Sequence, residues 1–110
     1  MRVFALVTVY FPSSNHIENI KLLSKQVEQV YICDNSKKNN EKLFFNISNS
    51  VYVYNEGNKG LSAAFNKLLK SKLGEWKEED KIIFFDQDSK IGPHHIENLC
   101  EKFSELEKKG

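Results

Sequence analysis

Four short apolar runs, each followed by a cluster of polar residues, constrain the fold of this 110-residue chain more than any other feature. The first run, Val3–Val9, is continuous and rich in β-branched residues. Such a run is typical of a strand that is covered on both faces, as in a parallel sheet. The other runs are Val30–Cys33, Val51–Tyr54 and Lys81–Phe85.

Segments with apolar residues at helical spacing separate these predicted strands. We expect a first helix near residues 16–27, with Asn15 as its N-cap and Glu18 completing a capping box. The alternating order of strands and helices predicts an α/β fold with a parallel sheet and right-handed crossovers. The further expected helical segments are a short piece at Leu43–Phe45, a helix over Leu61–Lys72, and a last helix with Pro93 near its first position.

The composition is that of a single globular domain and excludes several functions. The 16 basic and 15 acidic side chains leave a net charge of +1, which argues against binding to nucleic acid or to an anionic membrane. The two cysteines, Cys33 and Cys100, are too few for a disulfide scaffold. We expect both to be buried in the core of a protein from a reducing compartment. No run approaches the roughly 20 apolar residues that span a bilayer. The sequence therefore predicts a cytoplasmic location.

The polar clusters after the strands are expected to meet at one edge of the sheet. In an open parallel sheet, ligands bind beyond the carboxyl ends of the strands. The clusters come from distant parts of the chain, so only the fold can bring them together. They are Thr8–Tyr10, Asp34–Ser36, Asn55–Gly60 and Asp86–Ser89.

Asp86 and Asp88 form a D-x-D pair at the end of the fourth predicted strand. If the backbone stays extended there, side chains two residues apart point to the same side. Two carboxylates suit Mg²⁺ or Mn²⁺, which complete their coordination with water and substrate phosphates. The alternative is a pair of acids that cap the turn into the last helix.

Other residues of these clusters each allow two interpretations. Asp34 could accept a hydrogen bond from a base or a ribose, or it could start the loop as an Asx-turn residue. Gly57 and Gly60 could let backbone amides approach a phosphate, or serve an ordinary turn. Their spacing fits neither common nucleotide-binding glycine motif. Tyr10 could stack on a base or lie half-buried in the core.

Four stretches together resemble family 2 glycosyltransferases, and among these they are most similar to bacterial rhamnosyltransferases. The stretches are VTVYFP, VYICDNS, NKGLSAAFNKLL and IIFFDQDS, in this order along nearly the whole chain. The resemblance implies the nucleotide-binding half of a GT-A fold, a Rossmann-like and mostly parallel sheet flanked by helices, with strand order 3-2-1-4. It also implies transfer of a sugar, with inversion, from a nucleoside-diphosphate donor to an acceptor hydroxyl.

The resemblance also implies roles for particular residues. The residues along or around the nucleotide would be Thr8, Tyr10, Asp34, Asn58, Gly60, Asn66 and Asp86, and those that hold Mg²⁺ or Mn²⁺ would be Asp86 and Asp88. The chain departs from the family pattern at Ser36, which follows Asn35 directly, and at Phe65, where many relatives carry Arg.

The implied partners are a dTDP- or UDP-sugar and a saccharide acceptor. For a rhamnosyltransferase the donor would be dTDP-L-rhamnose and the acceptor a growing surface polysaccharide. In the family, the acceptor site and the catalytic base lie further along the chain than the metal motif. Residues 1–110 are therefore interpreted as one domain, the nucleotide-sugar-binding portion of a larger enzyme. We then expect the fourth strand to leave an open sheet edge through which the chain self-associates. Membrane association of the complete protein stays an alternative.

Three other classes fit the sequence less well. A nucleotidyltransferase would carry a Gly-rich basic loop after the first strand, and a phosphatase of the haloacid dehalogenase type would carry its D-x-D there. A non-catalytic module of the receiver type would need an acidic cluster at the same position, where this chain has TVYFPSS. A nucleotidyltransferase or a non-catalytic nucleotide-binding fragment is the main alternative.

Overall fold

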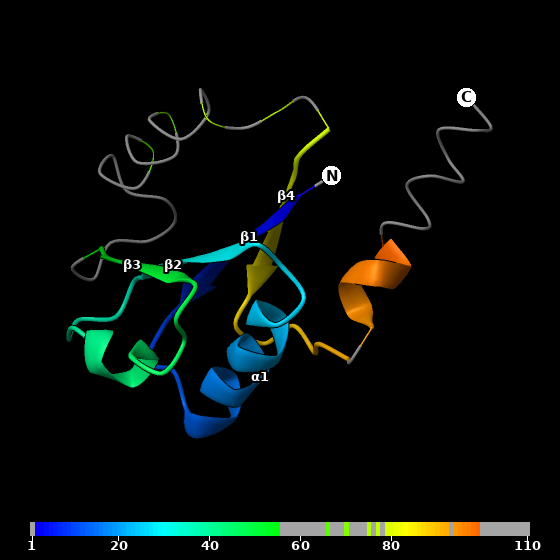
Figure 1. Ribbon diagram of the computed structural model, residues 1–110. Coiled ribbons are helices and arrows are strands. Elements are labelled where there is room, and N and C mark those ends of the chain that lie inside the picture. The colour runs from blue at the N-terminus through cyan, green and yellow to red at the C-terminus, as the bar shows by residue number, and fades with distance from the viewer. Residues whose placement is uncertain are drawn as a thin grey trace.

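A computed structural model describes residues 2–55, 66, 70, 75, 77, 79–92 and 94–99 of the chain. All neighbouring strands of its sheet are parallel, in the order β3-β2-β1-β4 (Figure 1). The predicted α/β class and the strand order are therefore confirmed. The strands are β1 (Val3–Val9), β2 (Gln29–Asp34), β3 (Ser50–Tyr54) and β4 (Lys81–Asp86).

Strand β1 is buried on both faces, as its continuous apolar sequence predicts. On one face, Ala5 and Val7 pack in a core with side chains of helix α1 (Ser14–Ser24) and of the 3-10 helix η1 (Glu41–Phe44). Figure 1 shows α1 and η1 on this same side of the sheet. On the other face, Phe4 and Leu6 of β1 form a second, smaller cluster with Tyr31 and Cys33 of β2.

Helix α1 begins earlier than predicted, because a different residue caps it. Ser13 has an extended backbone and its hydroxyl accepts a hydrogen bond from the backbone N–H of His16, while the imidazole of His16 accepts one from the backbone N–H of Ser13. This is a capping box in which His replaces the usual Glu or Gln. The prediction of Asn15 and Glu18 in these roles was wrong; Glu18 instead pairs with Lys21.

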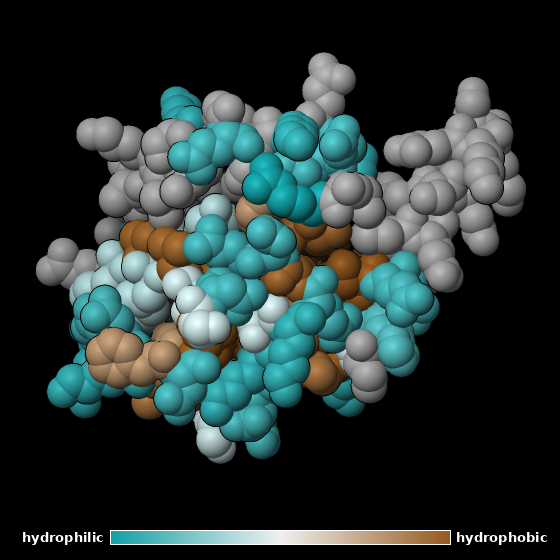
Figure 2. All heavy atoms as spheres, in the orientation of Figure 1, coloured by the Kyte–Doolittle hydropathy of each residue, from teal (hydrophilic) through white to brown (hydrophobic). Residues whose placement is uncertain are grey.

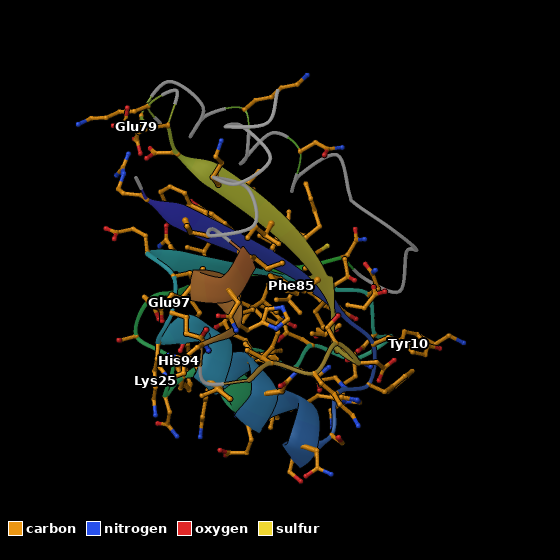
Figure 3. All side chains as sticks on the ribbon, turned by 90° about the vertical axis from the view of Figure 1, so that its right-hand side faces the viewer. Tyr10, Lys25, Glu79, Phe85, His94 and Glu97 are labelled. Atoms are coloured by element: carbon orange, nitrogen blue, oxygen red, sulfur yellow. The ribbon has the colours of Figure 1, made fainter. Side chains whose placement is uncertain are left out.

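The other predicted helical segments are only partly within the described residues. The piece expected at Leu43–Phe45 is η1, whose Phe44 is buried beside Tyr52. Residues 95–99 are helical, and His95 packs against Phe85 of β4, which Figure 3 labels. Asn66 and Lys70 are helical, whereas the rest of Leu61–Lys72, Pro93 and Cys100 lie outside the described residues.

The surface of the described part is mainly polar around an apolar band. In the space-filling view, polar side chains cover the lower part of the molecule, where Figure 1 shows α1, and apolar ones form a band across its middle (Figure 2). None of the described helices is long and apolar enough to cross a membrane. Within the described residues β4 pairs with β1 alone and leaves Phe84 60% exposed, so self-association through this edge stays a prediction.

An ion pair joins the amino ends of β1 and β4. The guanidinium of Arg2 donates to Asp80 Oδ2 from Nε at 3.2 Å and from Nη2 at 2.8 Å, and the backbone N–H of Arg2 donates to Oδ1 at 3.1 Å. The backbone N–H of Lys77 also donates to Oδ2, at 2.8 Å. The hydrogen bond from Arg2, helped by that from Lys77, lowers the pKa of Asp80 to about 2. This ion pair fixes the amino end of β4 against that of β1. The carboxyl end of β4 leads into the D-x-D pair.

We predict that Asp80→Asn destabilises the fold in a pH-dependent way. An acid whose pKa is lowered on folding contributes stability above its unfolded pKa, near 4, and this contribution is lost as the pH falls through the folded pKa. The excess free energy of unfolding of wild type over Asp80→Asn should therefore be largest at pH 6 and shrink from pH 4 toward pH 2. Urea unfolding at these pH values measures it, with the exposed neighbour Glu79→Gln as control. An excess that does not change with pH would contradict the assignment.

Candidate functional site

The parallel register brings the carboxyl ends of three strands together. Val9 of β1 is paired with Asp34 of β2, and Thr8 with Asp86 of β4. The pairing continues past the strands, since Asn35 N–H donates to the Val9 carbonyl at 2.8 Å and Gln87 N–H to that of Thr8 at 3.2 Å. Figure 3 shows Tyr10 at this end of the sheet and Glu79 at the other. The expected convergence of the polar clusters is therefore confirmed for β1, β2 and β4.

A cavity of about 160 Å³ lies at this edge. Residues from all three strand ends line it, and both acids of the D-x-D pair are among them. The lining residues are Thr8, Val9, Tyr10, Asn35, Asp86, Gln87 and Asp88. Larger cavities occur elsewhere, beside α1 and beside η1, but the D-x-D acids do not line them.

Two exposed aromatic side chains, Tyr10 and Phe11, follow β1 at this edge, and Tyr10 lines the cavity. The Gln87 amide holds the Tyr10 backbone by accepting from its N–H at 3.0 Å and donating to its carbonyl at 2.8 Å. The next residue, Phe11, has a φ of 44°, which non-glycine residues rarely adopt, and its N–H donates to Ser36 Oγ at 2.7 Å. Tyr10 and Phe11 are 54% and 53% exposed and meet edge to face at 4.6 Å between ring centres. A strained backbone that holds apolar rings in solvent is typical of a binding site.

The two acids of the D-x-D pair have different partners. Thr8 Oγ1 donates to Asp86 Oδ1 at 3.1 Å. Asp88 lies beyond the strand, in a turn that the Ser89 N–H closes on the Asp86 carbonyl at 3.0 Å. The premise of an extended backbone through Asp88 is therefore not met, although both acids line the same cavity. Asp88 Oδ1 lies 3.0 Å from Nε2 of His16, and the Asp88 side chain is 83% exposed.

The donor set fits a hard divalent cation that keeps most of its shell outside the protein. Within the described part of the chain, no group of three or more His, Cys, Asp and Glu side chains is arranged to hold a metal ion. Mg²⁺, however, is commonly bound through one or two carboxylates, with waters and substrate phosphates as its other ligands. Asp86 and Asp88 offer that number and kind of ligand at the cavity.

Asp34 is the centre of a buried hydrogen-bond network beside the cavity. Its side chain is fully buried; Oδ1 accepts from the Ser36 N–H at 2.9 Å, and Oδ2 accepts from the Asn40 amide at 2.9 Å and from the hydroxyl of Tyr52. Burial by itself would raise the pKa of Asp34, but hydrogen bonds from Ser36, Tyr52 and Asn40 outweigh it and leave the pKa below its usual value. Asp34 thus forms the Asx-type turn that was one of its two interpretations. A bond to a base or ribose would have to replace one of these partners, and it stays a prediction.

The carboxyl end of β3 contributes to the site through Asn55, which lies next to this network. Asn55 is buried, its N–H donates to the Asp34 carbonyl at 2.7 Å, and its side-chain amide donates to Asn35 Oδ1. Asn35 in turn lines the cavity. Asn58 and Gly60 lie outside the described residues, and Asn66 is an exposed helical residue that is not among the residues lining the cavity.

Two residues of this site, His16 and Phe11, were missed from the sequence. Gln87 lay within the predicted Asp86–Ser89 cluster, but its pairing with the backbone of Tyr10 was not predicted. The contact of His16 with Asp88 joins residues 72 positions apart and had no local signal.

Comparison with known protein families agrees with this geometry. The family model of "Glycosyl transferase family 2" matches residues 13–110, which is most of the chain. The chain belongs to glycosyltransferase family 2. No curated protein and no solved structure matches it. The cavity at the carboxyl edge of this glycosyltransferase domain is therefore its candidate donor site.

We predict that Tyr52→Phe destabilises this glycosyltransferase domain. The Tyr52 hydroxyl donates to Asp34 and accepts from the Asn40 N–H at 2.9 Å, so its removal leaves two groups without this partner. The loss should be about 1–3 kcal/mol of unfolding free energy. Tyr10→Phe removes an exposed hydroxyl and should change the unfolding free energy by less than about 0.5 kcal/mol. Urea unfolding compares the two, and an equal effect of both variants would contradict the role of the Asp34 network.

Proposed function

We propose that this chain binds the nucleoside diphosphate of a sugar donor at the carboxyl edge of its sheet, through a divalent cation held by Asp86 and Asp88. The donor sugar is then transferred, with inversion, to a saccharide acceptor. Family membership supports glycosyl transfer. The observation that supports a bound cation is the negative charge of the cavity.

Among the described residues, those that line the cavity carry two carboxylates and no lysine or arginine. A diphosphate carries at least two negative charges, so Asp86 and Asp88 would repel it if they met it directly. Like charges about 4 Å apart repel by roughly 1 kcal/mol per pair in bulk water and by roughly 4 kcal/mol where the effective dielectric is near 20. A bound Mg²⁺ or Mn²⁺ reverses the sign of this interaction. The acid pair therefore favours an anionic ligand only when a cation lies between them.

The protein's own residues prepare the site for such an ion. The hydroxyl of Thr8 holds one oxygen of Asp86, and His16 contacts one oxygen of Asp88, so each carboxylate is oriented before a ligand arrives. When bound, the cation would neutralise the diphosphate and stabilise it as a leaving group. Gln87 fixes the backbone of Tyr10 and so keeps the rim of the cavity in place.

The exposed ring of Tyr10 is the proposed platform for the nucleotide base. A base stacked on an aromatic side chain gains about 1–3 kcal/mol, whatever its identity. Asn35 lines the cavity and is the proposed hydrogen-bond partner of the nucleotide, and Asp34 supports the loop from behind. A uracil or a thymine base fits this proposal, and dTDP-L-rhamnose is the donor that the sequence resemblance favours.

The complete reaction needs parts beyond this site. We propose that residues 1–110 form the donor-binding portion, with Asn58, Gly60 and Asn66 shaping the nucleotide pocket. The base that deprotonates the acceptor hydroxyl and the acceptor site are proposed to lie in other segments of the enzyme. On this proposal the chain alone binds a nucleoside diphosphate and transfers sugar slowly.

The test is a calorimetric titration of UDP and of dTDP, with and without Mn²⁺, into wild type and Asp88→Ala. We expect binding to wild type only with Mn²⁺, because the cation is needed to offset the acid pair. Asp88→Ala should weaken this binding by more than about tenfold, since changes around a metal ligand alone typically cost that much. The preference between UDP and dTDP indicates the base.

Glu18→Ala is the matched control for this titration, because it removes an exposed carboxylate that does not line the cavity. It should bind like wild type. Equal, metal-independent binding by wild type and Asp88→Ala would remove the metal assignment.

A further inference from the structure

One face of helix α1 holds the segment that follows β4. Asn19 uses both ends of its amide, donating to the Ser89 carbonyl and accepting from the Ile91 N–H at 3.0 Å. Residues 89–92 form no helix or strand of their own. Their conformation, and with it the position of the preceding turn, therefore depends on these side chains of α1.

Gln26, just past the end of the helix, holds the same segment further on. Its amide donates to the Gly92 carbonyl at 2.8 Å and accepts from the Ile96 N–H at 3.1 Å. His16, Asn19 and Gln26 are three and seven residues apart, the spacing of one helix face. The turn that carries Asp88 and the segment after it are thus held by a row of polar side chains from α1 and from the residues just past its end.

His16, the first member of this row, is held as one tautomer of its neutral ring by the cap of its own helix. The backbone N–H of Ser13 lies 3.0 Å from Nδ1 of His16, and a backbone N–H can only donate. Nδ1 therefore carries no proton, and the proton of the neutral ring is on Nε2. Nε2 lies 3.0 Å from Asp88 Oδ1, so this N–H donates to the carboxylate.

This contact contributes little to folding, because a pair with an exposed partner gains little in water. The Asp88 side chain is 83% exposed, whereas that of His16 is only 25% exposed. The ring is fixed on its Nδ1 side by the helix cap, so it can orient a carboxylate that would otherwise move freely. Hydrogen bonds of this kind to a metal-ligating carboxylate orient it and tune its affinity for the metal.

We propose that His16 is a positioning residue for the divalent cation: its Nε2–H fixes Asp88 Oδ1, so that the other lone pairs of the carboxylate would be available to hold the ion. This proposal rests on the proposed function, because it needs a cation at Asp88. The capping box of α1 would then serve the donor site as well as the start of the helix.

The test measures Mn²⁺ binding, by the electron paramagnetic resonance signal of free Mn²⁺, in the presence of saturating UDP. His16→Ala should weaken Mn²⁺ binding about tenfold. His16→Gln should restore it to within about twofold, because the Gln amide can accept from the Ser13 N–H and donate to Asp88, and Gln is a common residue at this capping position. Ser13→Ala removes the hydroxyl, which accepts from the His16 N–H and lies 3.2 Å from Nδ1, but it keeps the backbone donor to Nδ1. It should lower the thermal unfolding midpoint and weaken Mn²⁺ binding less than His16→Ala does.

The outcomes separate this proposal from the proposed function. Wild-type affinity in His16→Ala, together with loss in Asp88→Ala, would overturn the role of His16 and leave the donor site intact. Equal losses in His16→Ala, His16→Gln and Ser13→Ala would show that His16 acts only through the helix. Wild-type affinity in Asp88→Ala would remove both proposals.

A second measurement keeps the proposal testable if His16→Ala does not fold. Long-range ¹H–¹⁵N correlation of the His16 ring in wild type should show the proton on Nε2 and none on Nδ1. A ring protonated mainly on Nδ1 would contradict the arrangement.

Discussion

The position of β1 in the middle of the sheet is the constraint on which the rest of the structure depends. Its side chains are buried on both faces, so the strand must lie between two neighbours and under a helix. Its backbone bonds then set β2 and β4 in a register that aligns Val9 with Asp34 and Thr8 with Asp86. The strand-end polar groups of the candidate site follow from this alignment, because the strands end together at one edge.

Three acids at this edge have different environments and therefore different roles. Asp34 is buried and satisfied by protein donors, which makes it a support for the loop after β2. Asp86 and Asp88 face a cavity, and among the described side chains each contacts one, Thr8 and His16 respectively. A carboxylate that keeps open lone pairs toward an aqueous cavity suits a cation, and one that is enclosed by donors does not. The sequence places all three acids at strand ends, but it does not show which of them protein donors enclose.

Much of the fold could be predicted because its signals are local. The continuous apolar runs located all four strands to within a residue or so at each end, and the carboxyl-edge rule brought Tyr10 and the D-x-D pair to one cavity. The start of α1 was misplaced because Ser13 and Asn15 are both good caps, and a His at the third position is not the usual partner of a capping box. The strained Phe11, the clamp of Gln87 on Tyr10 and the contact of His16 with Asp88 depend on tertiary geometry, which no spacing in the sequence reports.

The proposed cation site lies where the three strand ends meet, and paramagnetic broadening by Mn²⁺ tests it most directly. In a ¹H–¹⁵N spectrum of the chain with UDP, a small amount of Mn²⁺ should broaden the amide signals of Tyr10, Asn35 and Gln87 first. The amides of Asn49 and Glu79, at the amino ends of β3 and β4, should stay sharp. Broadening that begins at the amino ends, or that spreads evenly over the chain, would contradict the account.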